Sequence, residues 1–422
     1  MNEERNPFTP GFSRVPAVFA GRQEALGAFD EALSVAALDG STPTPMVLVG
    51  PRGMGKTVLL HELSAKAAQD YGWPSIGAEA RPRASLVEAL QADVQRVLAV
   101  VEEAPKQPKM RLAEVVLRAG VAGVGGEAHL SRGTAVSEDR NLRDSVELLV
   151  SKLADHDGGL VVTIDEAQNA SQTDLAEVGE LFQVATRSGW PLVSAIAGLP
   201  ALRPGKLPSY FERADWHLVG TLSLQATLHS LVVAAREAGR PFEADAVGEL
   251  AAYTGGYPYA VQFYGHAAWR ASHGAPSITR EAVRTAEDDA YRRLSATLFP
   301  QRLEQASPRE REYLRAVAEL LAEGQVPTGQ AVAGRLGKST QALAQHRDRL
   351  LTKGTLLADE HHALRFFIPA MADYVLEQAA APPTLGSLTD LSFPVVRPGR
   401  RSAPALMQND EPTTSKGGHI ER

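Results

Sequence analysis

The stretch GPRGMGKT at residues 50–57 decides the fold. It matches the phosphate-loop pattern of a glycine, four further residues, and then glycine, lysine and serine or threonine. An apolar run at 46–49 precedes it, and a segment of helical period at 56–70 follows it. A chance glycine turn that happens to contain a lysine would not be expected to have both flanks. The stretch therefore predicts a strand, a phosphate-binding loop and a helix in succession.

The loop residues suit a polyphosphate chemically. Glycines let backbone N–H groups converge on phosphate oxygens, the Lys56 ammonium can neutralise the β and γ phosphates, and the Thr57 hydroxyl can bind Mg²⁺. The residues expected to contact the nucleotide here are Gly50, Pro51, Arg52, Gly53, Met54, Gly55, Lys56 and Thr57.

A second motif supplies the acids that such a loop requires. The segment LVVTIDE at residues 160–166 is an apolar strand that ends in Asp165 and Glu166. We expect Asp165 to hold Mg²⁺ through water and Glu166 to polarise the water that attacks the γ phosphate. The alternative is that both acids only cap the next helix, since acids are favoured at helix N-termini.

Composition restricts the class of protein. The length of 422 residues predicts two or three domains, and a composition of 44% hydrophobic and 22% charged residues is typical of soluble globular protein and argues against a mainly disordered or fibrous chain. The absence of cysteine excludes disulfides, thiolate metal sites and a cysteine nucleophile. Residues 1–14 have no apolar run typical of a signal peptide, and no stretch approaches the length of a membrane span, so we expect a cytoplasmic protein. A net charge of −7 does not favour polyanion binding by the whole chain, although a local basic patch could still contact nucleic acid.

The order of the predicted elements indicates an α/β fold with several parts. Apolar strands alternate with helices up to about residue 222, as in a parallel sheet covered on both faces. After residue 222 the sequence predicts helices without strands as far as about residue 297. Within the strand–helix part, residues 104–133 are predicted to be an irregular insertion. The predicted parts are a flexible segment at 1–16, a nucleotide domain at 17–222, a helical lid at 223–303, a winged helix at 304–378 and a disordered tail at 379–422.

The winged-helix prediction rests on three helices at 309–323, 328–336 and 339–351, which are followed by two short apolar runs. Arg347, Arg349 and Lys353 could contact the phosphates of double-stranded DNA, because such a helix fits a major groove. Against DNA, the wing carries the acids Asp359 and Glu360. Winged helices also serve as regulatory or dimerising modules, so a protein partner stays open. No metal site is expected at the two histidines at 361–362.

These motifs together resemble the AAA+ ATPases of the origin-recognition-complex-like branch, close to bacterial proteins that also resemble STAND signalling ATPases. The resemblance also rests on VFAGR at 18–22, AGLP at 197–200, SYFER at 209–213 and GGYPY at 255–259. It implies an α/β P-loop core with a helical lid, and ATP and Mg²⁺ as ligands.

The resemblance further implies roles for single residues. Phe19, Gly21 and Arg22 would lie beside the adenine; alternatively, Phe19 packs in the core and Arg22 lies at the surface. Arg213 would be a finger that reaches the γ phosphate of a neighbouring subunit in a homo-oligomer, with Arg203 as the other candidate and a surface salt bridge as the alternative. Tyr257 and Pro258 would pack against the nucleotide.

Two departures from the AAA+ pattern favour slow hydrolysis. The fourth strand ends in apolar residues at 195–198, where many AAA+ proteins orient water with a polar side chain, and the lid has GYPY at 256–259 in place of an arginine. We therefore expect a slow ATPase that acts as a regulatory switch and couples nucleotide state to the winged helix. The alternatives are an ATP-controlled DNA-binding initiator or regulator, and a nucleotide-dependent protein scaffold.

Overall fold

The computed structural model describes residues 5–11, 14–103, 140–202, 207–359 and 361–380. The predicted insertion at 104–133 and nearly all of the predicted tail lie outside these residues. Residues 1–379 group into one compact unit.

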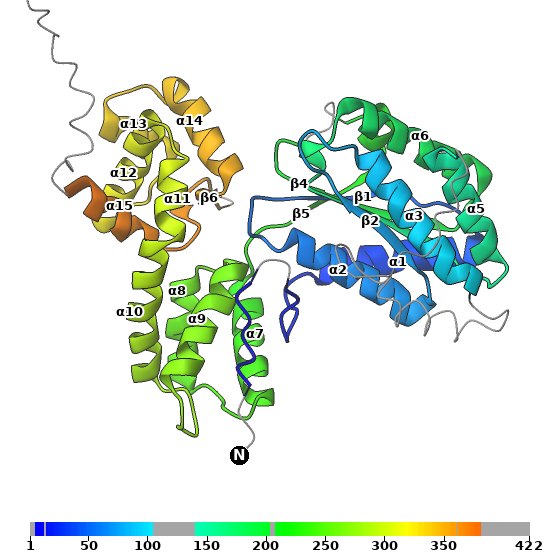
Figure 1. The fold of residues 1–422 in the computed structure, drawn as a ribbon. Helices are drawn as coiled ribbons and strands as arrows, with labels where there is room; N and C mark the ends of the chain where they lie inside the picture. The colour runs from blue at the N-terminus through cyan, green and yellow to red at the C-terminus, as the bar shows by residue number, and fades with distance from the viewer. Residues whose placement is uncertain (1–4, 12–13, 104–139, 203–206, 360, 381–422) are drawn as a thin grey trace, which may run out of the picture. The chain divides into compact units, whose positions relative to one another are not determined.

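A parallel sheet of five strands organises the N-terminal half (Figure 1). Its order is β2-β3-β4-β1-β5, so the first strand lies between the fourth and the fifth. The strands are β1 (Met46–Val49), β2 (Ser75–Glu79), β3 (Leu160–Asp165), β4 (Leu192–Gly198) and β5 (Asp215–Leu218). Every residue of β3 and β4 is buried, as expected for central strands covered on both faces.

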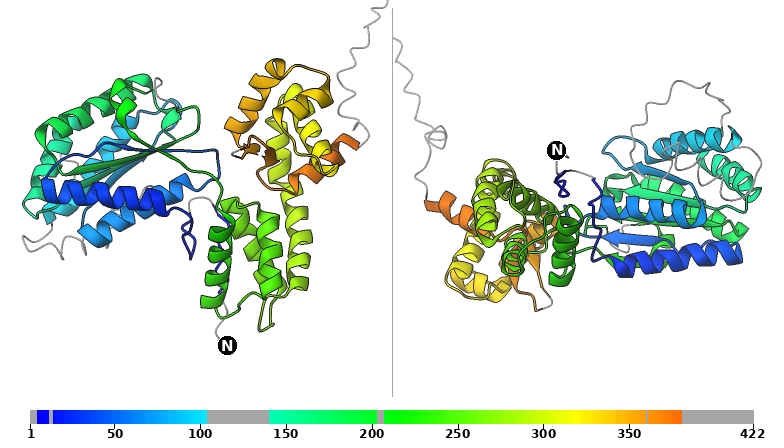
Figure 2. Two further views of the ribbon diagram at one scale, coloured as in Figure 1. Left: turned by 180° about the vertical axis from the view of Figure 1, so that it is seen from behind. Right: turned by 90° about the horizontal axis from the view of Figure 1, so that it is seen from below.

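Helices cover both faces of this sheet (Figure 2). Buried side chains of α1 (Gln23–Asp39) and α2 (Lys56–Lys66) belong to one hydrophobic cluster. Those of α3 (Leu86–Glu103), α5 (Leu142–Ala154) and α6 (Gln172–Ser188) belong to a second cluster. A turn of π-helix at Ala67–Tyr71 extends α2, so the predicted helix at 56–70 has two parts. The α/β P-loop prediction is confirmed.

Four helices follow as a lid: α7 (Leu224–Glu237), α8 (Ala244–Thr254), α9 (Pro258–Ala271) and α10 (Arg280–Ala296). The N-terminal segment, predicted to be flexible, packs against the lid where it is described. Phe8 is 1% exposed and packs so closely on α9 that a Cβ on Gly265 would lie 2.6 Å from its ring. The Thr9 N–H donates to the Gln262 side chain at 3.2 Å. Burial of one large aromatic ring is sufficient to dock this segment on the lid.

The rest of the described chain forms the C-terminal helical region, residues 298–380. It contains α11 (Leu298–Glu304), α12 (Pro308–Ala322), α13 (Gly329–Leu336), α14 (Thr340–Lys353), the antiparallel hairpin of β6 (Leu356–Ala358) and β7 (Leu364–Phe366), and α15 (Met371–Ala380). Three helices and a hairpin occur in the predicted order. The last helix was not predicted, and its last two residues, 379 and 380, overlap the predicted tail. Among the described helices, each is too short or too polar to cross a membrane.

Candidate nucleotide site

The phosphate loop connects β1 to α2 at the carboxyl end of the strand. Gly53 and Gly55 have φ angles of 80° and 82°, a left-handed conformation that glycine adopts at little cost. Lys56 is the first residue of α2, so the free N–H groups of the first helical turn face the loop. This arrangement favours a bound anion.

Lys56 is 5% exposed and makes its contacts within the loop. Its Nζ donates to the carbonyl oxygens of Gly50 and Pro51 at 2.9 and 3.0 Å. Burial lowers the pKa of the Lys56 ammonium, while the nearby Glu166 and Asp165 act in the opposite direction. The group is thus a buried cation held by two neutral carbonyls, which phosphate oxygens could replace.

Asp165 ends β3 beside the start of α2 and is 3% exposed. Thr57 Oγ1 donates to Asp165 Oδ2 at 2.5 Å, and the Glu166 N–H donates to Asp165 Oδ1 at 2.8 Å. Burial raises the pKa of the Asp165 carboxyl. A hydroxyl and a carboxylate oxygen in contact fit Mg²⁺, which binds few protein oxygens and completes its shell with water and phosphate.

Glu166 does not act as a helix cap through its side chain. It stands at the N-cap of the short 3-10 helix Ala167–Asn169 without a capping side-chain hydrogen bond, and its φ of 50° is left-handed. Its Oε2 accepts from Gln168 Nε2 at 2.5 Å, and Gln168 Oε1 accepts from the Leu199 N–H at 2.9 Å. Gln168 therefore links the acid after β3 to the end of β4. Sequence reasoning missed this residue, whose only signal is its place two residues after Glu166.

Arg22 is partly buried, and its side chain is hydrogen-bonded to the phosphate loop. Its Nη2 donates to the Met54 carbonyl at 2.9 Å and to the Gly220 carbonyl at 2.7 Å. Burial lowers the pKa of Arg22 to about 10. Phe19 is half-buried against the core, and Gly21 has a φ of 73°. A place beside the adenine remains a prediction for all three.

Arg213 lies at the amino ends of the parallel strands, whereas its own phosphate loop lies at their carboxyl ends. It ends the short helix Ser209–Arg213, just before β5, and Asp215 at the start of β5 pairs with Met46 at the start of β1. The side chain is exposed, and no ion pair is found for it among the described residues. A finger role would therefore require the phosphate of another subunit. Arg203 lies outside the described residues.

Tyr257 is brought to the phosphate loop by the start of α9, where Pro258 is the first helical residue. Tyr257 is 3% exposed, and its hydroxyl donates to the Arg52 carbonyl at 3.5 Å. A Cβ on Gly53 would lie 1.8 Å from this hydroxyl, so only glycine fits there. The Tyr257 ring meets Phe367 of the C-terminal helical region edge to face, with centroids 5.2 Å apart.

The C-terminal helical region also contacts the loop directly. A Cβ on Gly354, which ends α14, would lie 2.9 Å from Pro51 Cβ and 3.5 Å from the Arg52 nitrogen. Arg365 of β7 donates from Nη1 to the Gly255 carbonyl at 2.7 Å and from Nη2 to Thr221 Oγ1 at 2.8 Å. We call these contacts, together with that of Phe367 on Tyr257, the loop contact. Sequence reasoning did not connect any of the three C-terminal residues with the nucleotide.

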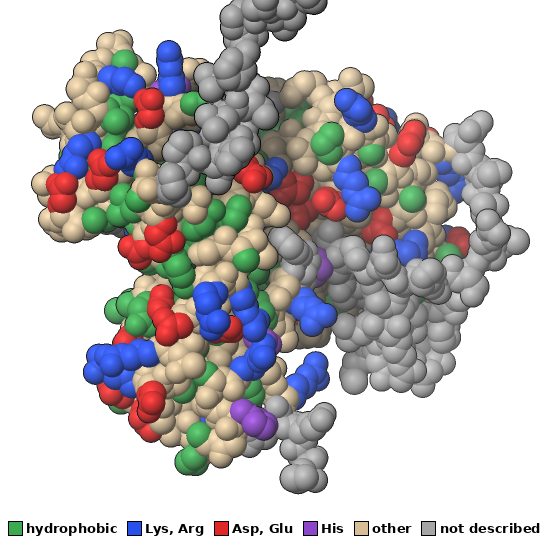
Figure 3. All heavy atoms as spheres, turned by 60° about the vertical axis from the view of Figure 1, so that its left-hand side comes forward, with side chains coloured by type: hydrophobic (Ala, Val, Ile, Leu, Met, Phe, Trp, Pro, Cys, Tyr) green, Lys and Arg blue, Asp and Glu red, His purple; other side chains and the backbone are tan. Residues whose placement is uncertain are grey.

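The predicted DNA contacts need one correction. Lys353 is not a free cation, because its Nζ lies 2.8 Å from the carboxylate of Glu310, a residue that is 1% exposed, and donates to the Gln305 carbonyl. For Arg347 and Arg349 the described part of the chain shows no ion pair. On the face seen in Figure 3, basic and acidic side chains are interspersed. Asp359 is described in the hairpin turn, and Glu360 lies outside the described residues.

Comparisons with known proteins agree with this geometry. Residues 18–194 match the family model of the AAA ATPase domain, and residues 296–375 match a domain of unknown function, DUF8462. No curated protein matches the chain. The structure is similar to a Walker-type ATPase of Pyrococcus abyssi, with 17% identity, a TM-score of 0.56, and coverage of 85% of this chain and 96% of that one.

It is also similar to the ORC2 protein of Aeropyrum pernix in its ADPNP and ADP complexes, with 14% identity, a TM-score of 0.54, and coverage of 88% of this chain and 98% of that one. At these identities the likenesses show the fold. The protein therefore contains an AAA ATPase domain, built on an α/β P-loop sheet and followed by a helical lid and a C-terminal helical region with a small hairpin.

Proposed function

We propose that this protein is an ATP-binding regulatory switch that hydrolyses ATP slowly and couples its nucleotide state to the C-terminal helical region, which we interpret as a winged helix. The observation that carries the proposal is the loop contact. Gly354 rests on Pro51 and Arg52, and Phe367 packs on Tyr257, whose hydroxyl reaches the same loop. A nucleotide that enters the loop must therefore act on the surface against which this region packs.

Each loop residue has a defined role in this proposal. Lys56 would leave the Gly50 and Pro51 carbonyls to bind the β and γ phosphates, and Thr57 and Asp165 would hold Mg²⁺, which would neutralise phosphate charge. Glu166 orients the attacking water and accepts its proton. Arg22 positions the loop through the Met54 carbonyl and does not touch the phosphates.

Three features support slow turnover. Glu166 is engaged by Gln168, so its carboxylate must leave that hydrogen bond before it can orient water. The fourth strand ends in Ala197 and Gly198, which offer no polar side chain for the water. The lid brings Tyr257 to the loop in place of an arginine, so a positive charge on the transition state would have to come from elsewhere.

Coupling follows from the position of Pro51. Its carbonyl accepts from Lys56, and its Cβ faces Gly354. When phosphates draw the Lys56 ammonium away, the Pro51 peptide loses its only side-chain donor among the described residues and is free to rotate. Rotation of this peptide displaces the surface under Gly354, and the C-terminal helical region responds.

Titration calorimetry with Mg·ATP tests the nucleotide site. Lys56→Ala should abolish or severely weaken binding, while Lys66→Ala on the same helix, where the lysine pairs with Asp30 and Asp70, should bind as the wild type does. Glu166→Gln should bind ATP and fail to turn it over. Wild-type affinity in a folded Lys56→Ala protein, or wild-type turnover in Glu166→Gln, would contradict these assignments.

Duplex DNA binding is the second candidate, and it is favoured by Arg347 and Arg349, for which the described residues offer no ion pair. Neutralising both should lower the slope of log affinity against log salt by about 0.9 for each DNA phosphate that the protein no longer neutralises. Lys353→Ala should instead lower stability, because it leaves the Glu310 carboxylate buried without its partner. Absence of salt-sensitive binding by the full chain favours a protein partner.

A homo-oligomer is the assembly that would give Arg213 a function. The residue is exposed at the edge of the sheet away from its own loop. Arg213→Ala mixed with Glu166→Gln should then restore turnover at mixed interfaces, since each defect lies in a different subunit's half of the site. A mixture no more active than either variant alone would remove the finger role.

A further inference from the structure

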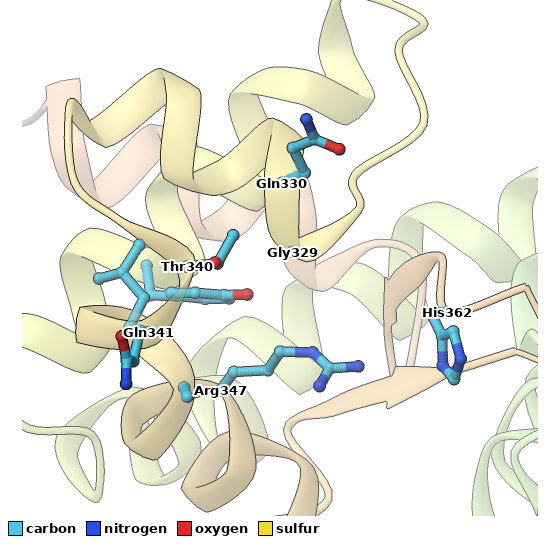
Figure 4. A pocket seen from close by; sticks show the side chains of 9 residues that line it. Gly329, Gln330, Thr340, Gln341, Arg347 and His362 are labelled. Atoms are coloured by element: carbon cyan, nitrogen blue, oxygen red, sulfur yellow. The ribbon is translucent and has the colours of Figure 1, made fainter.

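A pocket of about 460 Å³ lies in the C-terminal helical region (Figure 4). Its lining comes from the three main helices of the region and from the hairpin turn. Tyr313 comes from α12, Gln330 from the first turn of α13, Thr340 and Arg347 from α14, and His362 from the turn between β6 and β7. None of these residues belongs to the nucleotide site.

Two buried polar atoms of this pocket have no hydrogen-bond partner among the described residues. One is the hydroxyl of Tyr313, a residue that is 1% exposed, and the other is Nε of Arg347. A buried donor without an acceptor carries an unrecovered desolvation cost, and such groups are rare in native proteins. Two of them around one cavity indicate that a ligand with acceptor atoms completes it.

The charge of the pocket selects an anion. The Arg347 guanidinium is permanently positive, and no carboxylate is present among the lining residues. Burial raises the pKa of Tyr313, with Arg347 acting in the opposite direction, so the hydroxyl keeps its proton and remains a donor. Figure 4 shows Arg347 extending from α14 across the pocket toward His362.

We propose that this pocket binds a small organic molecule that carries a phosphate group. The donors come from two helices, Tyr313 from α12 and both Thr340 and Arg347 from α14. A tetrahedral phosphate can accept from several directions, whereas a planar carboxylate matches only the guanidinium fork. Leu343 and Ala344 add an apolar wall for the organic part. A duplex backbone is too stiff to place a phosphate against a hydroxyl whose residue is 1% exposed.

Calorimetry on the full chain tests the proposal, with phenyl phosphate as the probe, benzoate as its carboxylate counterpart and a short DNA duplex as the third arm. Each titration is made in the wild type and in Lys56→Ala, because the phosphate loop also binds phosphate. Heat of phenyl phosphate binding that is still measured in Lys56→Ala belongs to the pocket and not to the phosphate loop. A failure of the pocket proposal can therefore be told apart from a failure of the nucleotide-site proposal.

The variants separate the pocket from general charge. Arg347→Ala should raise the dissociation constant for phenyl phosphate about tenfold or more, and Tyr313→Phe should raise it severalfold. Arg349→Ala removes the same charge two residues away, in a different groove, and should leave it unchanged. Without the probe, Tyr313→Phe should melt at or above the wild-type temperature, because it deletes an unpartnered hydroxyl and keeps the ring.

Three results would overturn the proposal. The first is that phenyl phosphate fails to bind the Lys56→Ala protein at millimolar concentration. The second is that Arg347→Ala and Arg349→Ala weaken the binding of phenyl phosphate equally. The third is that benzoate binds as tightly as phenyl phosphate. Arg347 would instead be assigned to a nucleic-acid surface if duplex DNA displaces phenyl phosphate and if Arg347→Ala and Arg349→Ala lower the affinity of the protein for the duplex equally.

Discussion

Arg365→Ala should release the C-terminal helical region from the phosphate loop. Arg365 is half-buried in β7, and burial lowers the pKa of its guanidinium. It donates to the Gly255 carbonyl, just after α8, and to Thr221 Oγ1, between β5 and α7. These two hydrogen bonds join the hairpin both to the lid and to the segment that connects lid and sheet.

The expected magnitude follows from these bonds. A hydrogen bond from a charged donor contributes about 1.5 to 3 kcal/mol, and the lower end applies to a half-exposed side chain, so the pair contributes about 3 kcal/mol. At 1.4 kcal/mol for each factor of ten, that corresponds to an increase of about a hundredfold in the open population. The substitution leaves the buried apolar side chains of the region in place, so the loss appears as opening and not as unfolding.

Hydrogen exchange measured by mass spectrometry on the full chain without nucleotide detects this opening. Exchange at 364–367 and at 50–57 should accelerate together, by about a hundredfold in Arg365→Ala and by about tenfold in Arg365→Lys, which retains one donor. Arg315→Ala, which removes an exposed arginine paired with Glu319 on α12, should change neither segment. Unchanged exchange at both segments in a folded Arg365→Ala protein would refute this reasoning.

Three further predictions concern the lid, the loop contact and the N-terminal segment. Glu249 accepts hydrogen bonds from Arg280, Arg284 and Tyr253, and those from the two arginines lower its pKa from 4.5 to about 2. Its contribution to stability is therefore complete above pH 4.5 and is lost as the pH falls toward 2. Glu249→Gln should flatten the fall of the unfolding free energy in this acid range, and an unchanged fall would contradict the prediction. Gly354→Leu should push the C-terminal helical region off Pro51, because Gly354 has a φ of 68° and Pro51 fills the space for a side chain. Nucleotide should then associate faster in stopped-flow mixing. An unchanged association rate would argue against the contact. Phe8→Ala should destabilise the lid by about 3 kcal/mol or more in chemical denaturation, as for other buried phenylalanines; a loss below about 1 kcal/mol would mean that the segment is not docked.

The sequence predicts what is local in the chain. The phosphate loop and β1 have their expected bounds, because the motif and the apolar run before it are contained in one short segment. The pairing of Thr57 with Asp165 was also predictable, since two motifs that follow strands of one parallel sheet both lie at the carboxyl ends of its strands, here with β4 between β1 and β3.

Contacts between distant segments were not accessible in the same way. Arg365 meets residues more than 100 positions earlier, and nothing in the alternation of its strand indicates a partner. In the sequence Lys353 is a basic residue of a predicted recognition helix. In the structure it forms an ion pair with Glu310, which also forms the capping box of α12 with Ser307. Phe8 lies in a polar, proline-containing stretch with Phe12 as the other aromatic residue, and two residues do not establish a periodicity that would indicate the lid that buries Phe8.

The central claim is that a nucleotide in the phosphate loop controls the C-terminal helical region. Hydrogen exchange of residues 354–367 in the Glu166→Gln protein, with and without saturating Mg·ATP, tests it most directly, because ATP binds there without turning over. We predict faster exchange in this segment when ATP is bound, and no change in Lys56→Ala under the same conditions. Identical exchange with and without bound ATP in Glu166→Gln would contradict the claim.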